Sequence, residues 1–261
     1  METVLIYVGL GIGAGLLAGM LGVGGGQVVV PGLLYIFHLK GFHNGYLVHM
    51  ALGTSLATIV VTSLSSAYSH YRLGSINLNL VKRMTPGIVI GAALGGLAAG
   101  YFPSGALRMM FGVFLILLAV QMAFSLKPKP ERELPPAASL TAISGVIGWV
   151  SAVVGVGGGS MVVPYLSWCN VNMKTAVGTA SACGVPLALA GMAGYVISGW
   201  SYRELPSYSL GFIYVPAWLA VSLLSIVFTR VGASLTHRLP VASLKKLFSG
   251  FLFIAGIRIL I

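Results

Sequence analysis

A glycine-rich motif occurs twice in this chain, and it constrains the fold more than any other feature. Residues 22–31 read Gly-Val-Gly-Gly-Gly-Gln-Val-Val-Val-Pro, and residues 155–164 read Gly-Val-Gly-Gly-Gly-Ser-Met-Val-Val-Pro. Consecutive glycines destabilise a helix, so each copy predicts that one helix ends there and another begins. We therefore expect a duplicated protein whose halves are broken at equivalent positions.

The apolar composition places these breaks in a membrane. Of 261 residues, 57% are hydrophobic and 7% are charged, whereas about a quarter of the residues of a soluble protein are charged. Inside a bilayer, irregular backbone is tolerated only where protein or a water-filled cavity surrounds it. Paired breaks at equivalent positions of two halves are typical of the binding site of a transporter.

The acidic residues narrow the substrate class. The chain has no Asp and four Glu, at positions 2, 131, 133 and 204, each near a terminus or between apolar runs. Cation and proton pathways through membranes usually contain Asp or Glu. The sequence therefore favours an anionic or neutral substrate.

Other function classes find little support. The net charge of +11 is dispersed over short loops, so we expect no nucleic-acid partner. The two cysteines, Cys169 and Cys183, are too few for a zinc site and are expected to pack in the core, and no cofactor is indicated. No nucleophile stands at readable spacing from a base, so the chain is not expected to be an enzyme.

The chain divides into ten apolar segments and one hydrophilic stretch. The linker 127–136 separates a first membrane repeat, 1–126, from a second, 137–261. The segments 27–38 and 160–169 directly follow the glycine motifs and are too short to span a bilayer. The ten segments are 4–21, 27–38, 47–69, 84–101, 106–125, 138–155, 160–169, 174–198, 207–229 and 241–261. The first segment lacks the basic flank and cleavage site of a signal peptide, so we expect it to belong to the fold.

The basic residues predict the topology. If the two segments around each glycine motif form one membrane crossing, 8 of the 15 basic residues fall on one side of the membrane and 7 on the other. If each half has five segments, the division becomes 11 against 4, as the positive-inside rule requires. The minor group is Lys40, Arg108, Arg203 and Arg258. This count predicts a cytoplasmic linker, both termini outside, and two inverted repeats. The expected fold is an all-α polytopic membrane protein with about five helical segments in each inverted repeat, each repeat having a glycine-broken or re-entrant helix pair.

Further pairs of similar residues support the duplication. Residues 51–55, Ala-Leu-Gly-Thr-Ser, match residues 176–180, Ala-Val-Gly-Thr-Ala, and Pro86 matches Pro216.

The broken helices suggest an anion site. The first N–H groups of a helix have no intrahelical partner and carry partial positive charge, so two helix N-termini could hold an anion. Gln27 and Ser160, directly after the glycines, each add a side-chain donor. The alternative is that glycines only let helices approach closely, which we prefer for Gly91, Gly95 and the glycines of residues 9–15.

Hydroxyl groups form a second polar feature, recurring at helical spacing in the third segment and opening the eighth. They could line an oxyanion path, or they could bond to neighbouring helices or to their own backbone. The residues are Thr54, Ser55, Thr58, Thr62 and Ser66, followed by Thr179, Ser181 and Cys183. The five histidines lie near expected helix ends, where an interfacial position is typical, although His49 or His70 could accept a proton in coupled transport.

These motifs resemble the TauE/SafE family of sulfite and sulfonate exporters over nearly the whole chain. The resemblance implies a multi-pass transporter of small sulfur-containing anions, such as sulfite, sulfoacetate or other organosulfonates, in the bacterial or archaeal plasma (inner) membrane. The candidate substrate-binding residues are Gly24, Gly25, Gly26, Gln27, Thr54, Ser55, Gly157, Gly158, Gly159, Ser160, Thr179 and Ser181.

The expected mechanism is alternating access, with one half rocking against the other around an anion at the midplane. Two alternatives stay open. A channel for small anions or neutral solutes would give unsaturable flux, and a non-transporting assembly subunit would tolerate Gly25→Ala and Gly158→Ala. The sequence does not indicate the particular anion, the direction, the coupling ion or the oligomeric state.

Overall fold

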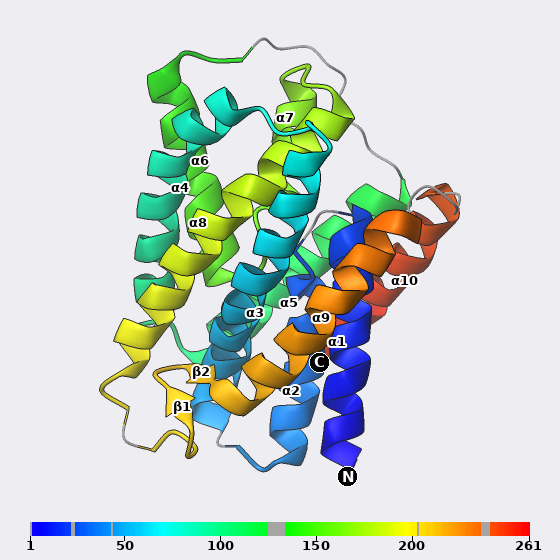
Figure 1. Ribbon diagram of the computed structural model, residues 1–261. Helices are drawn as coiled ribbons and strands as arrows, with labels where there is room; N and C mark the ends of the chain where they lie inside the picture. Colours follow the sequence, from blue (N-terminus) through cyan, green and yellow to red (C-terminus); the bar gives the residue numbers. More distant parts are fainter. Residues whose placement is uncertain (1, 22–23, 43, 125–133, 203, 236–240) are drawn as a thin grey trace.

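The computed structural model is a bundle of α-helices with one small hairpin (Figure 1). It describes the chain except residues 1, 22–23, 43, 125–133, 203 and 236–240, so most of the expected linker 127–136 lies outside the described residues. The first repeat contains α1 (Glu2–Leu21), α2 (Gly26–Leu39), α3 (Asn44–Arg72), α4 (Leu78–Ala99) and α5 (Ser104–Ala123). The second contains α6 (Ala137–Val153), α7 (Gly159–Trp168), α8 (Met173–Gly199), β1 (Ser209–Leu210), β2 (Ile213–Tyr214), α9 (Val215–Leu235) and α10 (Val241–Leu260). The expected all-α membrane fold is confirmed.

Helix lengths agree with the predicted breaks. Within the described residues, α3, α4, α5, α8 and α9 are long and apolar enough to cross a membrane. The 14 residues of α2 and the 10 of α7 correspond to about 21 Å and about 15 Å, too short to cross alone.

Helix starts follow from capping chemistry. The Asn77 side chain accepts hydrogen bonds from the backbone N–H groups of Asn79 and Leu80, each at 3.1 Å. This cap starts α4 at Leu78, six residues before the predicted segment. Asn172 caps α8 in the same way, accepting from the Lys174 N–H at 3.0 Å.

The predicted apolar segment 207–229 is not one helix. Its first residues form the hairpin, in which Ser209 pairs with Tyr214 and Leu210 with Ile213, and α9 begins only at Val215. Gly211 adopts a left-handed φ of 53° at the turn, and the following Phe212 is fully buried. Apolar content alone could not distinguish a buried hairpin from the first turns of a helix.

Packing partners are exchanged between the two repeats. Helix α1 packs on α9 and its counterpart α6 packs on α4, while α3 packs on α9 and its counterpart α8 packs on α4. The counterparts α3 and α8 also pack on each other, as do α5 and α10. Figure 1 shows α3 and α8 running in opposite directions. This pattern agrees with a duplication; the inverted relation of the whole repeats stays a prediction.

Glycines permit these close pairings. A Cβ at Gly91 of α4 would overlap the carbonyl oxygen of Gly145 in α6, and one at Gly15 of α1 would lie 2.7 Å from that of Ser225 in α9. The packing interpretation is therefore confirmed for these glycines. Gly9 differs, since an added Cβ would have no atom within 4 Å.

Candidate functional site

The two glycine breaks meet each other inside the protein. A Cβ built on Gly24 would lie 3.4 Å from the Cα atom of Gly157, and one built on Gly26 would lie 2.9 Å from the carbonyl oxygen of Gly155. Motifs more than a hundred residues apart in the sequence therefore form one cluster of backbone. Helix α2 begins at this cluster at Gly26, and α7 begins there at Gly159.

The first break requires glycine for its backbone conformation. Gly24 and Gly25 have φ values of 80° and 75°, in the left-handed region that side chains disfavour. Gly25 is the residue before the first turn of α2, and a Cβ there would lie 2.9 Å from the Ala14 carbonyl oxygen.

The second break has a different conformation despite its similar sequence. Gly155 has a φ of 67°, but Gly158, which precedes α7 as Gly25 precedes α2, has the helical values φ −57° and ψ −22°. A Cβ at Gly158 would meet only side-chain atoms, the nearest being Cδ1 of Leu187 at 3.2 Å. The two breaks are thus alike in sequence and unlike in geometry.

Two hydroxyl groups of α3 hold both breaks. The Ser55 hydroxyl donates to the Gly155 carbonyl oxygen at 2.9 Å. The Thr62 hydroxyl lies 3.1 Å from the Gly24 carbonyl oxygen, and 3.3 Å from that of Ile59 in its own helix. Both side chains are fully buried. Because backbone outside a helix needs partners inside a membrane, these bonds stabilise the irregular segments.

The other predicted hydroxyls also bond to protein. The Thr58 hydroxyl donates to the Thr54 carbonyl oxygen of its own helix at 3.0 Å. The Ser66 hydroxyl donates across to that of Ser181 in α8 at 3.1 Å, and Ser181 lies 3.0 Å from the Val177 carbonyl oxygen. These are the interhelical and own-backbone bonds of the alternative interpretation.

The duplicated threonines have reciprocal partners. Thr54 in the first repeat accepts from the N–H of Tyr214, next to the start of α9, at 2.9 Å. Thr179 in the second repeat accepts from the N–H of Asn77, next to the start of α4, at 3.1 Å. Each threonine therefore holds the entry to a helix of the other repeat. A role for either in substrate binding stays a prediction.

Gln27 and Ser160 behave differently at the helix starts. Gln27 is 1% exposed, and its Nε2 has no hydrogen-bond partner among the described residues. Ser160 is also buried, but its hydroxyl donates to the Gly157 carbonyl oxygen at 3.0 Å. An unpaired buried donor is costly, so the Gln27 amide is the group at this site most in need of an acceptor.

A proline in each short helix removes one helical hydrogen bond. Pro31 lies inside α2 and Pro164 inside α7. Proline has no N–H, so it cannot bond the carbonyl oxygen four residues earlier, which belongs to Gln27 in one helix and to Ser160 in the other. The two short helices therefore share this feature as well as their glycine-rich starts.

One buried side chain near the second break was not singled out by the sequence. Tyr195 of α8 is fully buried, and its hydroxyl donates to the carbonyl oxygen of Val153, the last residue of α6, at 3.2 Å. The available signal was a tyrosine within the glycine- and alanine-rich run of α8.

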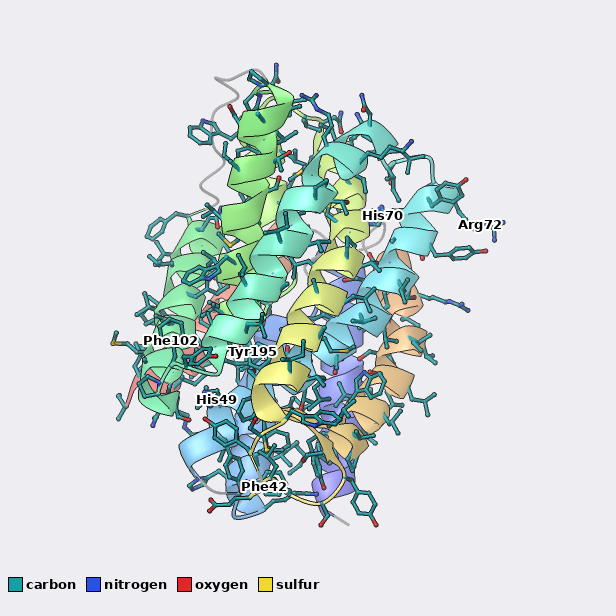
Figure 2. The ribbon with its side chains drawn as sticks, turned by 90° about the vertical axis from the view of Figure 1, so that its left-hand side faces the viewer. Phe42, His49, His70, Arg72, Phe102 and Tyr195 are labelled. Atoms are coloured by element: carbon teal, nitrogen blue, oxygen red, sulfur yellow. The ribbon has the colours of Figure 1, made fainter. Side chains whose placement is uncertain are left out.

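Two of the described histidines, His49 and His70, lie toward opposite ends of α3 (Figure 2), while His38 lies exposed in the last turn of α2. His49 is buried rather than interfacial, since its Nε2 lies 3.0 Å from the Phe102 carbonyl oxygen and its ring stacks on Phe212 with centroids 4.9 Å apart. His70 lies nearer the other end, where its Nδ1 is 3.0 Å from the Ser75 hydroxyl. His43 and His237 lie outside the described residues.

The cysteines and histidines do not gather into a cluster. The described part of the chain contains no group of three or more His, Cys, Asp or Glu residues that could hold a metal ion. Both Cys169 and Cys183 are buried free thiols, as expected of packing residues.

Known proteins similar to this chain are membrane transporters by name. A Haemophilus influenzae protein called probable membrane transporter protein is 38% identical, over 97% of each chain. A Methanocaldococcus jannaschii protein with the same description is 29% identical over 98% of this chain and 94% of its own length. A Bacillus subtilis probable membrane transporter protein is 28% identical over 89% and 90%.

The family comparison agrees with the resemblance drawn from the glycine motifs. Residues 7–259 match the family described as Sulfite exporter TauE/SafE, which covers both repeats and both breaks. The chain is thus a multi-pass membrane protein and belongs to the TauE/SafE family.

Proposed function

We propose that the protein exports small sulfur-containing anions, such as sulfite, sulfoacetate or other organosulfonates, by alternating access. The substrate site is the cluster formed by the two glycine breaks. The protein lies in the plasma membrane with the linker cytoplasmic and both termini outside. The family match and the transporter names of the relatives support transport, and the family description supports the sulfur anion.

The observation that carries the proposal is the buried amide of Gln27 at the meeting point of the breaks. Its Nε2 has no partner among the described residues, and it stands in the first turn of α2, where the helix dipole is positive. A sulfite or sulfonate oxygen would accept from this amide and from the N–H groups of the helix start. The protein thus offers donors to an anion without burying a charged side chain.

Energetics allow export without a coupling ion. In a cell whose interior is negative, an anion leaving the cell moves down the voltage and gains about 2.3 kcal/mol per charge for each 100 mV. Uptake of the same anion would need a coupling ion. The absence of Asp from the chain, and the placement of all four Glu near a terminus or between apolar runs, agree with an exporter.

The test is uptake of radiolabelled sulfite into proteoliposomes, with sulfate and a small sulfonate as competitors. The Gln27→Leu variant keeps the side-chain size and removes the donor, while Gln121→Leu makes the same change in α5, outside the site. We expect saturable flux, competed by the sulfonate, that falls at least tenfold in Gln27→Leu alone, since a hydrogen bond to a charged group contributes about 1.5–3 kcal/mol.

Three results would count against the proposal. Unsaturable flux would indicate a channel, equal flux in the two variants would remove Gln27 from the site, and no flux under any imposed voltage would exclude sulfite. In the last case, thermal stabilisation by other anions would identify the substrate class.

A further inference from the structure

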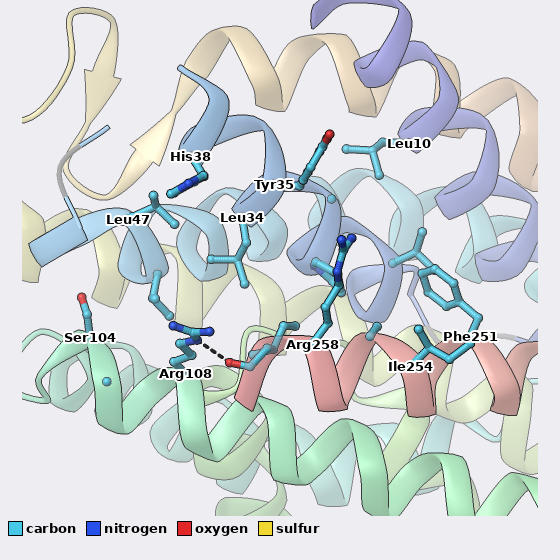
Figure 3. Close-up of a pocket in the computed structure, with 17 residues that line it drawn as sticks. Leu10, Leu34, Tyr35, His38, Leu47, Ser104, Arg108, Phe251, Ile254 and Arg258 are labelled. Carbon is cyan, nitrogen blue, oxygen red and sulfur yellow. Dashed lines mark hydrogen bonds between the residues drawn. The ribbon is translucent and has the colours of Figure 1, made fainter. Parts of the chain in front are cut away.

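A large groove lies between α1 and α2 on one side and α5 and α10 on the other (Figure 3), and its lining includes Val28 and Pro31 of the first glycine motif. Its volume is about 920 Å³. Most of its lining is aliphatic or aromatic, including Leu10, Leu34, Leu47, Phe251 and Ile254. In a membrane protein, such a surface is suited to hydrocarbon chains.

Two arginines interrupt this apolar lining. Arg108 lies in the second turn of α5 and Arg258 in the last turn of α10. The Arg108 Nε donates to the carbonyl oxygen of Ile259, the residue after Arg258, so both cationic side chains lie at the C-terminal turn of α10. Figure 3 shows both side chains beside the groove.

Neither arginine has an ion pair within the described part of the chain, and none of the chain's four Glu residues lines the groove. Apart from the bond between Arg108 and Ile259, the two guanidinium groups have no hydrogen-bond partner among the described residues. The pair therefore offers several N–H donors to an anion.

The topology makes this pair unusual. Only four of the 15 basic residues fall on the face predicted to be external, and Arg108 and Arg258 are two of them. A third, Lys40, is held by aromatic rings, since its Nζ lies 5.7 Å from the ring centroid of Tyr7 and 5.1 Å from that of Tyr214. The two arginines have no comparable partner, although the positive-inside rule disfavours basic residues on this face.

We propose that the groove binds one anionic phospholipid of the outer leaflet. Its phosphate lies between Arg108 and Arg258, and an acyl chain covers the apolar surface of Leu34, Phe251 and Ile254. A free anion the size of sulfite would leave nearly all of the 920 Å³ and its apolar lining unfilled. The combination of a paired cationic end and a long apolar wall matches a lipid and no small ion.

This inference is independent of the proposed substrate and is measured without transport. Purified, delipidated protein is titrated with phosphatidylglycerol, and binding is followed by native mass spectrometry, which reports bound lipid and oligomeric state together. Phosphatidylethanolamine has acyl chains but no net charge, so it tests whether binding needs a negative charge. Inorganic phosphate is an anion without acyl chains, so it tests whether binding needs the chains. The variants are Arg258→Gln, which removes no hydrogen bond to a described residue, and Arg108→Gln/Arg258→Gln. The matched control is Arg72→Gln/Lys174→Gln at the opposite end of the bundle.

We expect one phosphatidylglycerol to bind to wild type and control more tightly than phosphatidylethanolamine. Arg258→Gln should bind it about tenfold more weakly and the double variant more weakly still, because each arginine donates charge-assisted bonds to phosphate. Equal binding by the double variant and wild type would overturn the proposal. So would equal affinity for the two lipids, saturation by inorganic phosphate alone, or a change in the fraction of dimers without a change in bound lipid, which would assign the groove to a second copy of the chain.

Discussion

The unequal geometry of the two breaks predicts that the same substitution will have different effects at equivalent glycines. Gly25 and Gly158 occupy the same place in the duplicated motif. We expect Gly25→Ala to destabilise the protein strongly and Gly158→Ala to change its stability little. The comparison tests whether the conformation of each break, rather than its sequence, determines its tolerance.

The expected loss in the free energy of unfolding can be worked out from the structure for each variant. At Gly25, a left-handed φ of 75° costs an alanine about 1–2 kcal/mol. Its Cβ would also lie 2.9 Å from the Ala14 carbonyl oxygen, and overpacking against backbone adds about 1–3 kcal/mol. The expected loss in the free energy of unfolding is therefore about 2–5 kcal/mol. At Gly158, the backbone is helical and the close neighbour is the mobile end of Leu187, so the change should stay within about 1 kcal/mol.

The assay is equilibrium unfolding in mixed micelles, in which a denaturing detergent is titrated and tryptophan fluorescence is recorded. The chain has four tryptophans. A difference of at least about 1.4 kcal/mol between the two variants would correspond to a tenfold difference in the unfolding equilibrium. Equal destabilisation, or a larger loss at Gly158, would refute the reasoning. Equal stability of both variants and wild type, in a protein that shows no transport, would favour the non-transporting assembly subunit instead.

Three further predictions use the same titration. Ser55→Ala removes the bond to the Gly155 carbonyl oxygen and should cost about 0.6–1.7 kcal/mol, more than Thr58→Ala, whose hydroxyl bonds within its own helix; equal losses would contradict this. Phe212→Ala empties a fully buried site and should lower the free energy of unfolding by about 3–5 kcal/mol; a loss below about 1 kcal/mol would contradict the tight packing of this side chain. Thr54→Val and Thr179→Val each remove one reciprocal bond, about 1 kcal/mol, and a large difference between them would contradict the equivalence of the two repeats.

The sequence predicted the helices well because their signal is local. Long apolar runs mark the spanning helices, and consecutive glycines mark both breaks within a few residues. The hairpin at 209–214 was missed because its residues are as apolar as the helix that follows. A buried strand of two residues is too short for its periodicity to be recognised.

The candidate site was predicted only in part, since its geometry depends on contacts between distant segments. The motifs located the breaks, but no local pattern shows that Gly24 lies against Gly157. Likewise, the hydroxyls of α3 were recognised as a set, while their individual partners came from tertiary packing. The count of basic residues placed Arg108 and Arg258 on the same face, but it could not show that they line one groove, because the two residues are 150 positions apart.

The asymmetry of the hydroxyls indicates which part of the protein moves. When residues 51–55 of α3 are matched to residues 176–180 of α8, Ser55 corresponds to Ala180, and at the same offset Thr62 corresponds to Leu187. Helix α3 therefore hydrogen-bonds to both breaks, whereas the corresponding residues of α8 have no hydroxyl to offer. Breaking buried hydrogen bonds inside a membrane is costly, but sliding apolar side chains past one another is not. If one side of the site moves during transport, we expect it to be α8, which would have to break the bonds between Ser181 and Ser66 of α3 and between Tyr195 and the Val153 carbonyl oxygen, while α3 and the two breaks stay together.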